Sequence, residues 1–143
     1  MGTATMAHGA RIDSAVMFVQ DLGRSVSFYT DVLELEITDR DTTAALLTSA
    51  GGSSLILRAM GTGAVHPLGG TGVQYVIWTA ADQEDLDRCE RALKKRSAHI
   101  ETRSSGPVHA VEGRDPDGVA VMVTHPGPDE EPLHKLPSRI YGW

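Results

Sequence analysis

Apolar and polar positions follow first a strand pattern and then a helix pattern along the start of the chain. A short apolar strand is predicted over residues 15–20, AVMFVQ, and Asp21 then stands where a helix N-cap is expected. The helix is predicted over residues 22–34, because apolar residues recur at helical spacing at Leu22, Val26, Tyr29 and Leu33. Three more strands are expected after the helix, over residues 35–38, 43–50 and 53–60.

The same order of patterns restarts after a linker at residues 61–72, GTGAVHPLGGTG, whose five glycines are typical of a loop. A strand (73–80), a helix that is acidic at its start and basic at its end (82–98), and three strands (99–105, 108–114, 119–125) are expected. Aligning Ser14 with Gln74 gives an internal offset of about 60 residues. The sequence therefore predicts an α+β fold of two tandem βαβββ modules, at about 11–62 and 71–125, in one domain (11–125) with an extended C-terminal tail (126–143).

Composition narrows the class of protein. A chain of 143 residues with 41% hydrophobic and 22% charged residues fits one globular domain. The formal net charge of −6 and the lack of a basic stripe argue against a nucleic-acid partner, and no run approaches the ~20 apolar residues of a membrane span. Cys89 is the only cysteine, which excludes an intramolecular disulfide. The N-terminus lacks the apolar core of a signal peptide, so a cytoplasmic location is expected.

Two motifs carry a family resemblance. VQDLGRSVSFYTDVLEL, at residues 19–35, and RDPDGVAVMV, at residues 114–123, stand in this order in a chain of suitable length. Together they resemble the vicinal oxygen chelate superfamily, the group of glyoxalases, bleomycin-resistance proteins and extradiol dioxygenases. The resemblance implies that the two modules form a curved mixed sheet shaped as a cup. It also implies pairing into a homodimer.

The resemblance also implies where a metal ion would be held. The family's ligands come from the first and last strands of each module, and those positions carry Ser14, Ile56, Gln74 and Met122 here. Serine and glutamine are neutral donors, methionine offers a soft thioether, and isoleucine has no lone pair, whereas Zn, Fe, Mn and Ni require basic nitrogen or oxygen ligands. We therefore expect no metal and no cofactor.

Strand alternation predicts which side chains line the cup. In the register chosen, Ser14, Val16 and Phe18 share one face, as do Gln74, Val76 and Trp78, while the valines around Met122 pack under a helix. Such a lining suits a small, flat, largely apolar ligand held by a few polar groups. The predicted ligand-binding residues are Ser14, Phe18, Ile56, Arg58, Gln74, Trp78 and Met122.

Catalysis has fewer candidates. His109 and Glu112 lie at opposite parity on the seventh strand, so one of them at most faces the cup; His109 is the more plausible base and Arg58 a candidate for binding an anionic or carbonyl group. Two functions stay open: a metal-free binding protein that sequesters a small molecule as bleomycin-resistance proteins do, or a cofactor-free isomerase, cyclase or hydratase. The ligand positions argue against a metal-dependent glyoxalase or dioxygenase. The apolar ends of the tail, Ile140, Tyr141 and Trp143, are expected to dock on the cup or on a dimer partner.

Overall fold

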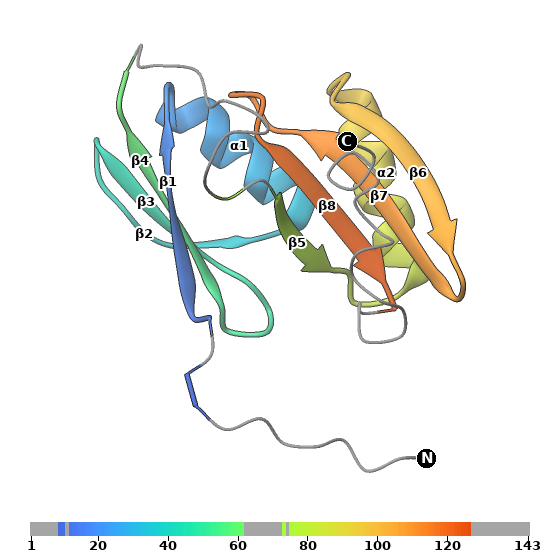
Figure 1. Cartoon of the computed structure of the whole chain (residues 1–143). Helices are drawn as coiled ribbons and strands as arrows, with labels where there is room; N and C mark the ends of the chain where they lie inside the picture. The colour runs from blue at the N-terminus through green and yellow to red at the C-terminus, as the bar shows by residue number, and fades with distance from the viewer. Residues whose placement is uncertain (1–8, 11, 62–72, 74, 127–143) are drawn as a thin grey trace.

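The computed structural model describes residues 9–10, 12–61, 73 and 75–126. Each half of the chain has the predicted βαβββ order, and Figure 1 shows α1 lying between the two sheets and α2 against β6 and β7. The elements are β1 (Ser14–Val19), α1 (Leu22–Leu33), β2 (Glu36–Arg40), β3 (Ala44–Thr48), β4 (Ser54–Ala59), β5 (Tyr75–Thr79), α2 (Gln83–Lys95), β6 (His99–Ser105), β7 (Val108–Arg114) and β8 (Ala120–His125).

The first helix begins where the sequence predicts, after the N-cap Asp21, whereas α2 spans Gln83–Lys95 instead of the predicted 82–98, because Asp82 is an N-cap as well. Asp21 and Asp82 are N-caps: the Asp21 carboxylate accepts a hydrogen bond from the Arg24 N–H, and the Asp82 carboxylate accepts one from the Asp85 N–H. A side-chain oxygen at this position satisfies an N–H group that the first turn of a helix leaves without a partner. The two caps are therefore equivalent points in the two modules.

Each module forms its own four-stranded sheet with the same strand order. The orders are β1-β4-β3-β2 and β5-β8-β7-β6, with β1–β4 and β5–β8 parallel and the remaining pairs antiparallel. The α+β prediction with two tandem modules is thus confirmed, and within the described part of the chain the strands form two sheets rather than one. The strand β2 runs to Arg40, two residues beyond its predicted end at residue 38.

The core lies between the sheets and contains both helices. Strands of both sheets supply buried side chains on one face, such as Leu55 and Leu57 from β4 and Val121 and Val123 from β8, and these pack with α1 and α2 in one cluster. Burying an aliphatic side chain of this size contributes roughly 1.5–3 kcal/mol. The face of each sheet that turns away from this core is called the open face below.

The approach of α2 to its sheet requires a glycine. A Cβ at Gly113 on β7 would lie 2.7 Å from the Leu93 side chain and 2.8 Å from the Ala98 carbonyl oxygen. Real Cβ atoms essentially never come so close to a neighbouring atom. Gly113 therefore sets the distance between α2 and β7.

The last hairpin of the second module binds the first helix. The Tyr29 hydroxyl donates to Asp115 Oδ2 at 2.8 Å, and Asp115 Oδ1 accepts from the N–H groups of Asp117 and Val119. The Asp117 carboxylate in turn accepts from the Gln20 N–H at 3.4 Å. This contact between the Asp115–Gly118 turn and α1, called the turn–helix contact below, joins the two modules through buried polar groups.

Arginines of α2 make a second connection between the modules. Arg88 donates to the carbonyl oxygens of Asp31 and Val32 in the last turn of α1, and it forms ion pairs with Glu34 and Asp85. The carbonyls at the end of a helix have no partner within the helix, so a guanidinium satisfies them well.

The predicted linker at 61–72, apart from Gly61, and the tail, apart from Pro126, lie outside the described residues. Of the helices in the described part of the chain, none combines the length and the apolar character that a membrane crossing requires.

Candidate functional site

The open face of the first module is apolar and half exposed. Val16 is paired with Ile56, and Phe18 is paired with Arg58, so all four side chains lie on this face. Val16 is 60% exposed and Phe18 64% exposed, although both are large apolar residues. The face as predicted is therefore present. On β1, β3 and β4 it includes Ser14, Val16, Phe18, Ala44, Leu46, Thr48, Ser54, Ile56 and Arg58, and Glu36 and Asp39 of β2 border it.

The open face of the second module is buried and partly polar. Ile77 is paired with Met122, which is paired with Glu112, and both Met122 and Glu112 are fully buried. The Tyr75 hydroxyl donates to Glu112 Oε2 at 3.0 Å. This face consists of Tyr75, Ile77, Val108, Ala110, Glu112, Ala120, Met122 and Thr124.

The predicted register of the fifth strand is wrong by one residue. The helix caps Asp21 and Asp82 differ by 61 positions, and the strand pairs agree with that offset, because Val16–Ile56 in one sheet corresponds to Ile77–Met122 in the other. Ser14 therefore corresponds to Tyr75, not to Gln74. Since side chains alternate along a strand, a shift of one residue moves every side chain to the opposite face.

Trp78 was expected on the open face, but the shift of one residue places it on the opposite face. It is paired with Val123 and packs against the common core, on the side of the sheet that faces the helices. Gln74, the second residue affected by the shift, lies outside the described residues. Met122, Ile56, Ser14, Phe18 and Arg58 all lie on the open faces, as the alternation predicted.

His109 also lies on the opposite side from the one proposed for a general base in the cup. His109 lies two residues before Val111, a core residue, so both side chains are on the helix-facing side of β7. His109 is exposed there and contacts Ser104. Glu112 is the member of the pair that lies on the open face.

Sequence reasoning missed the Tyr75–Glu112 pair. Tyr75 stands where Ser14 stands in the first module, and Glu112 lies two strands away from it, with β8 between them. Counting from the N-cap of each helix rather than from the start of each strand would have identified Tyr75, because caps are fixed by a specific hydrogen bond and strand ends are not. A phenol and a carboxylate in contact can bind a polar group or move a proton.

The side chains at the family's metal-ligand positions do not fit a divalent metal ion. With the corrected register these positions carry Ser14, Ile56, Tyr75 and Met122. Three lack a basic donor, and the phenol of Tyr75 is engaged by Glu112. Elsewhere in the described ranges, no three His, Cys, Asp or Glu side chains come together either.

Trp78 lines a pocket on the other side of the sheet, at the seam between the modules. The pocket has a volume of about 550 Å³ and lies between the end of α1, the β3–β4 turn and the start of α2. Cys89 also lines it, and burial raises the pKa of this thiol to about 11, so the thiol is protonated at neutral pH. The Trp78 Nε1 is buried and meets no hydrogen-bond acceptor among the described residues.

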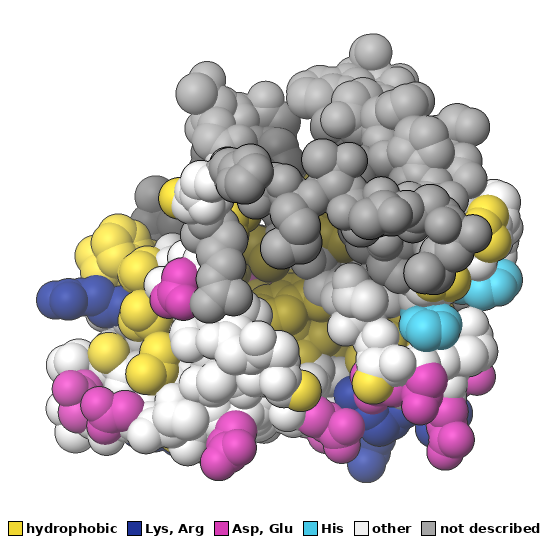
Figure 2. All heavy atoms as spheres, turned by 90° about the horizontal axis from the view of Figure 1, so that it is seen from below, with side chains coloured by type: hydrophobic (Ala, Val, Ile, Leu, Met, Phe, Trp, Pro, Cys, Tyr) yellow, Lys and Arg dark blue, Asp and Glu magenta, His cyan; other side chains and the backbone are white. Residues whose placement is uncertain are grey.

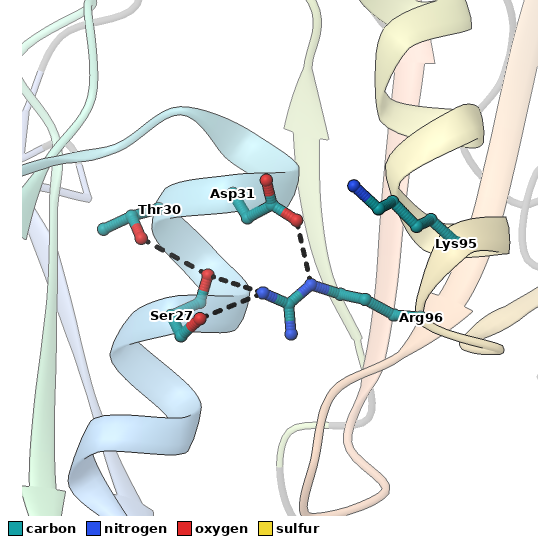
Figure 3. Close-up of a pocket in the computed structure, with 5 residues that line it drawn as sticks. All are labelled: Ser27, Thr30, Asp31, Lys95 and Arg96. Atoms are coloured by element: carbon teal, nitrogen blue, oxygen red, sulfur yellow. Dashed lines mark hydrogen bonds and ion pairs between the residues drawn. The ribbon is translucent and has the colours of Figure 1, made fainter.

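A second cavity, a cleft of about 590 Å³, separates the two helices (Figure 3). Arg96 spans it, donating through Nε to Asp31 at 2.9 Å and through Nη2 to the Ser27 carbonyl and hydroxyl oxygens. The polar groups that Figure 3 joins by dashed lines thus bind one another: Thr30 bonds to Ser27 within α1, and the bonds of Arg96 connect the end of α2 to α1.

Comparisons with known proteins agree with this architecture. The family model described as the glyoxalase/bleomycin resistance protein/dioxygenase superfamily matches residues 11–123. No curated protein matches the chain significantly.

Solved structures share the fold at low sequence identity. A glyoxylase/bleomycin resistance protein/dioxygenase domain from Frankia sp. EAN1pec is 23% identical, with a TM-score of 0.72 over 82% of this chain and 98% of that chain. A glyoxalase/dioxygenase from Nostoc punctiforme is 17% identical, with a TM-score of 0.71 over 87% and 97% of the two chains. A lactoylglutathione lyase from Agrobacterium tumefaciens is 19% identical, with a TM-score of 0.62 over 82% and 94%. At these identities the likeness shows the shared fold alone.

Proposed function

Because the chain belongs to the glyoxalase/bleomycin resistance protein/dioxygenase superfamily, we propose that it binds a small, largely apolar or aromatic organic molecule on its open faces without the help of a metal ion. The observation that supports this most is the set of side chains at the family's ligand positions: Ser14, Ile56, Tyr75 and Met122 replace basic donors with groups suited to carbon skeletons.

The exposed apolar surface of the first module supports the same proposal. Val16 and Phe18 lie beside Ile56 and Arg58 across the β1–β4 pair, so three apolar side chains and one cation form a small continuous surface. Exposed apolar groups of this kind favour contact with an apolar ligand, and Arg58 at the end of the row can bind a carbonyl or an anionic group.

Sequestration of a cationic drug, as in bleomycin-resistance proteins, is the version of this function that the charge favours. The chain carries a net charge of −6, and Figure 2 shows acidic side chains along the lower margin of this view, with Lys and Arg side chains among them. A net negative charge attracts a cation, and the exposed apolar surface suits aromatic groups that the cation carries.

Two probes test the binding surface. Titration with the fluorescent dye 1-anilinonaphthalene-8-sulfonate and calorimetry with metal-free bleomycin are each expected to show saturable binding, weakened about tenfold or more by Phe18→Ser or Ile56→Ser, since each removes an apolar contact of roughly 1.5–3 kcal/mol. Ile37→Ser is the matched control. Ile37 is also exposed, but it is paired with the buried Leu47 and so lies on the helix-facing side of the same sheet.

Equal loss of binding in Ile37→Ser and Phe18→Ser would contradict the assignment to the open face. If the dye binds and bleomycin does not, the proposal of drug sequestration is contradicted, and the proposal of an apolar binding site stands. Metal independence is tested in the same titrations, because affinities that fall when EDTA is added would contradict it.

The Tyr75–Glu112 pair favours a second function, a cofactor-free enzyme that acts on a small metabolite. The contact of 3.0 Å places a phenolic hydroxyl beside a buried carboxylate on the open face. In an isomerase, cyclase or hydratase, Glu112 would accept a proton from the substrate and Tyr75 would bind the oxygen on which charge develops. This pair takes the role that sequence reasoning gave to His109, and Arg58 remains a candidate for substrate binding.

An assay separates the two functions. Incubation of a bound ligand with the protein, followed by mass spectrometry and NMR, gives an unchanged ligand if the protein only binds and a product with time if it is an enzyme. In the second case, Glu112→Gln should abolish turnover and His109→Asn should leave it unchanged. Turnover that survives Glu112→Gln would remove this carboxylate from the mechanism.

We also propose that the protein forms a homodimer, since exposed apolar residues on an open face favour association. Light scattering after size-exclusion chromatography, with the intact chain and with a chain ending at residue 126, tests both the dimer and the predicted docking of the tail. A monomer at micromolar concentration would contradict the proposal.

A further inference from the structure

Two histidines face each other on neighbouring strands of the second sheet, on the side away from the open face. His109, the second residue of β7, is paired in register with His125, the last residue of β8. Paired residues of antiparallel strands have side chains on the same face, with Cβ atoms about 4.5–5.5 Å apart. Val111 and Val123, the next residues on that face, are in the core, so the histidines lie beyond its edge.

One nitrogen of the pair is already oriented by a neighbour. The Ser104 hydroxyl oxygen lies 2.7 Å from His109 Nδ1, and Ser104 is the residue paired with His109 on β6. When Nδ1 donates its hydrogen to this oxygen, Nε2 carries the lone pair and is available as a ligand. A hydrogen bond to the second ring nitrogen is the usual way in which proteins orient a histidine that binds a metal.

The two rings are accessible and uncommitted to other charges. His109 is exposed and His125 is half-buried. Across the ranges that the structure describes, neither ring forms an ion pair, and no third His, Cys, Asp or Glu joins them. An ion bound here would have two protein ligands and would complete its coordination with water.

We propose that His109 and His125 form a binding site for a divalent ion of the late first-row transition metals, Cu²⁺, Ni²⁺ or Zn²⁺. Imidazole nitrogen suits these ions, and Cu²⁺ binds most tightly in the series. The ion is held by Nε2 of His109 and a ring nitrogen of His125, with Ser104 as a positioning residue. This site is separate from the open faces and from the family's metal-ligand positions.

The full-length chain, stripped of metal with EDTA and dialysed, is titrated with CuCl₂ and followed by calorimetry and electron paramagnetic resonance. We expect one site whose spectrum shows two equivalent nitrogen ligands. His109→Asn and His125→Asn should each weaken it at least about tenfold, and the spectrum should then show one nitrogen or none from this site. Ser104→Ala should weaken binding by roughly tenfold while two nitrogens remain, because it removes orientation and not a ligand.

His99→Gln is the matched control. His99 lies on the same side of β6, but it is paired with Gly113 and its Nε2 lies 2.7 Å from the Thr102 hydroxyl, so its loss should leave copper binding unchanged. Histidines outside the described residues, His8, His66 and His134, are present in every variant and contribute the same background. Unchanged Cu²⁺ affinity in the His109→Asn/His125→Asn double variant, or a stronger effect of His99→Gln than of either single change, would overturn the proposal.

Discussion

The two modules follow one backbone plan, and they differ most on their open faces. In the first module this face is half exposed and mostly apolar around Val16 and Phe18, and its charged groups, Arg58 of β4 and Glu36 and Asp39 of β2, lie around that apolar part. In the second it is buried at Met122 and Thr124 and contains the Tyr75–Glu112 hydrogen bond. The strand order and pairing are the same in both modules, although the side chains on the open faces differ. The core-facing side chains therefore maintain the fold, and the side chains on the open faces can differ without changing it.

The hairpins that close the two modules differ as well. The turn at Asp115–Gly118 binds α1 through the turn–helix contact, with Asp115 and Asp117 accepting hydrogen bonds from Tyr29 and Gln20. The corresponding turn of the first module, around Gly51, instead lines the pocket at the seam. The connection made by the closing hairpins is therefore one-sided: the hairpin of the second module makes the turn–helix contact, and its equivalent in the first module lines a pocket.

Met122 and Ile56 occupy equivalent positions in the two modules. The largest expected difference in the free energy of unfolding is between the variants Met122→Ala and Ile56→Ala. Met122→Ala should lower the free energy of unfolding by about 2–5 kcal/mol, because the side chain is fully buried. Ile56→Ala should cost about 1 kcal/mol, because the side chain is only half-buried. Urea unfolding followed by circular dichroism measures both. Equal losses would mean that the two open faces are equally buried in solution.

Tyr29→Phe tests the one-sided connection. It removes a hydrogen bond to a buried carboxylate, so the free energy of unfolding at pH 8 should fall by about 2–3 kcal/mol. Ser25, one turn before Tyr29 on α1, offers a milder control, since Ser25→Ala removes only a 3.5 Å contact with Asp117 and should cost less than half as much.

The same variant has a pH dependence with a definite sign. Burial, and then the charge of Asp115, raise the pKa of Tyr29 well above its ordinary value. The folded protein therefore holds the phenolic proton more tightly than the unfolded chain, and the stability from neutral Tyr29 is complete below about pH 10 and declines at higher pH. Phenylalanine has no such proton, so the stability gap between wild type and Tyr29→Phe should narrow from pH 10 to 11. A constant gap would contradict the raised pKa.

Tyr75→Phe and Ser14→Ala compare the first open position of each module. Tyr75→Phe should cost about 1 kcal/mol, because the half-buried hydroxyl donates to Glu112. Ser14→Ala should change stability by less than about 0.5 kcal/mol, since Ser14 is exposed. Thermal unfolding of the two variants against wild type checks the order, and the reverse order would show that the two positions do not differ as described.

Phe18→Ser should have the smallest effect of all on stability, within about 0.5 kcal/mol, although it removes a large aromatic ring. Phe18 is 64% exposed, so the folded state gains little from it. A loss above 2 kcal/mol in chemical denaturation would show that this open face is covered in solution.

The secondary structure could be predicted almost completely, since both helices begin after an Asp cap and β6 and β7 have the expected bounds. Strand alternation also predicted correctly which side chains of β1 and β4 lie on the open face. It did not do so for β5, because YVIW is apolar at every position and has no polar residue to indicate which face is which. That ambiguity misplaced Trp78. His109 was misplaced because its strand, VHAVEGR, has polar residues on both faces, His109 on one and Glu112 on the other. The contact between Tyr75 and Glu112, 37 residues apart in sequence, could be found only in three dimensions.

The turn–helix contact also has a consequence for synthesis on the ribosome. Tyr29 leaves the exit tunnel 86 residues before Asp115, its buried partner. Since N-terminal segments are made first and can fold first, the nascent first module has to keep that hydroxyl hydrated until the last hairpin of the second module has been translated. That hairpin thus completes a half that was made long before it.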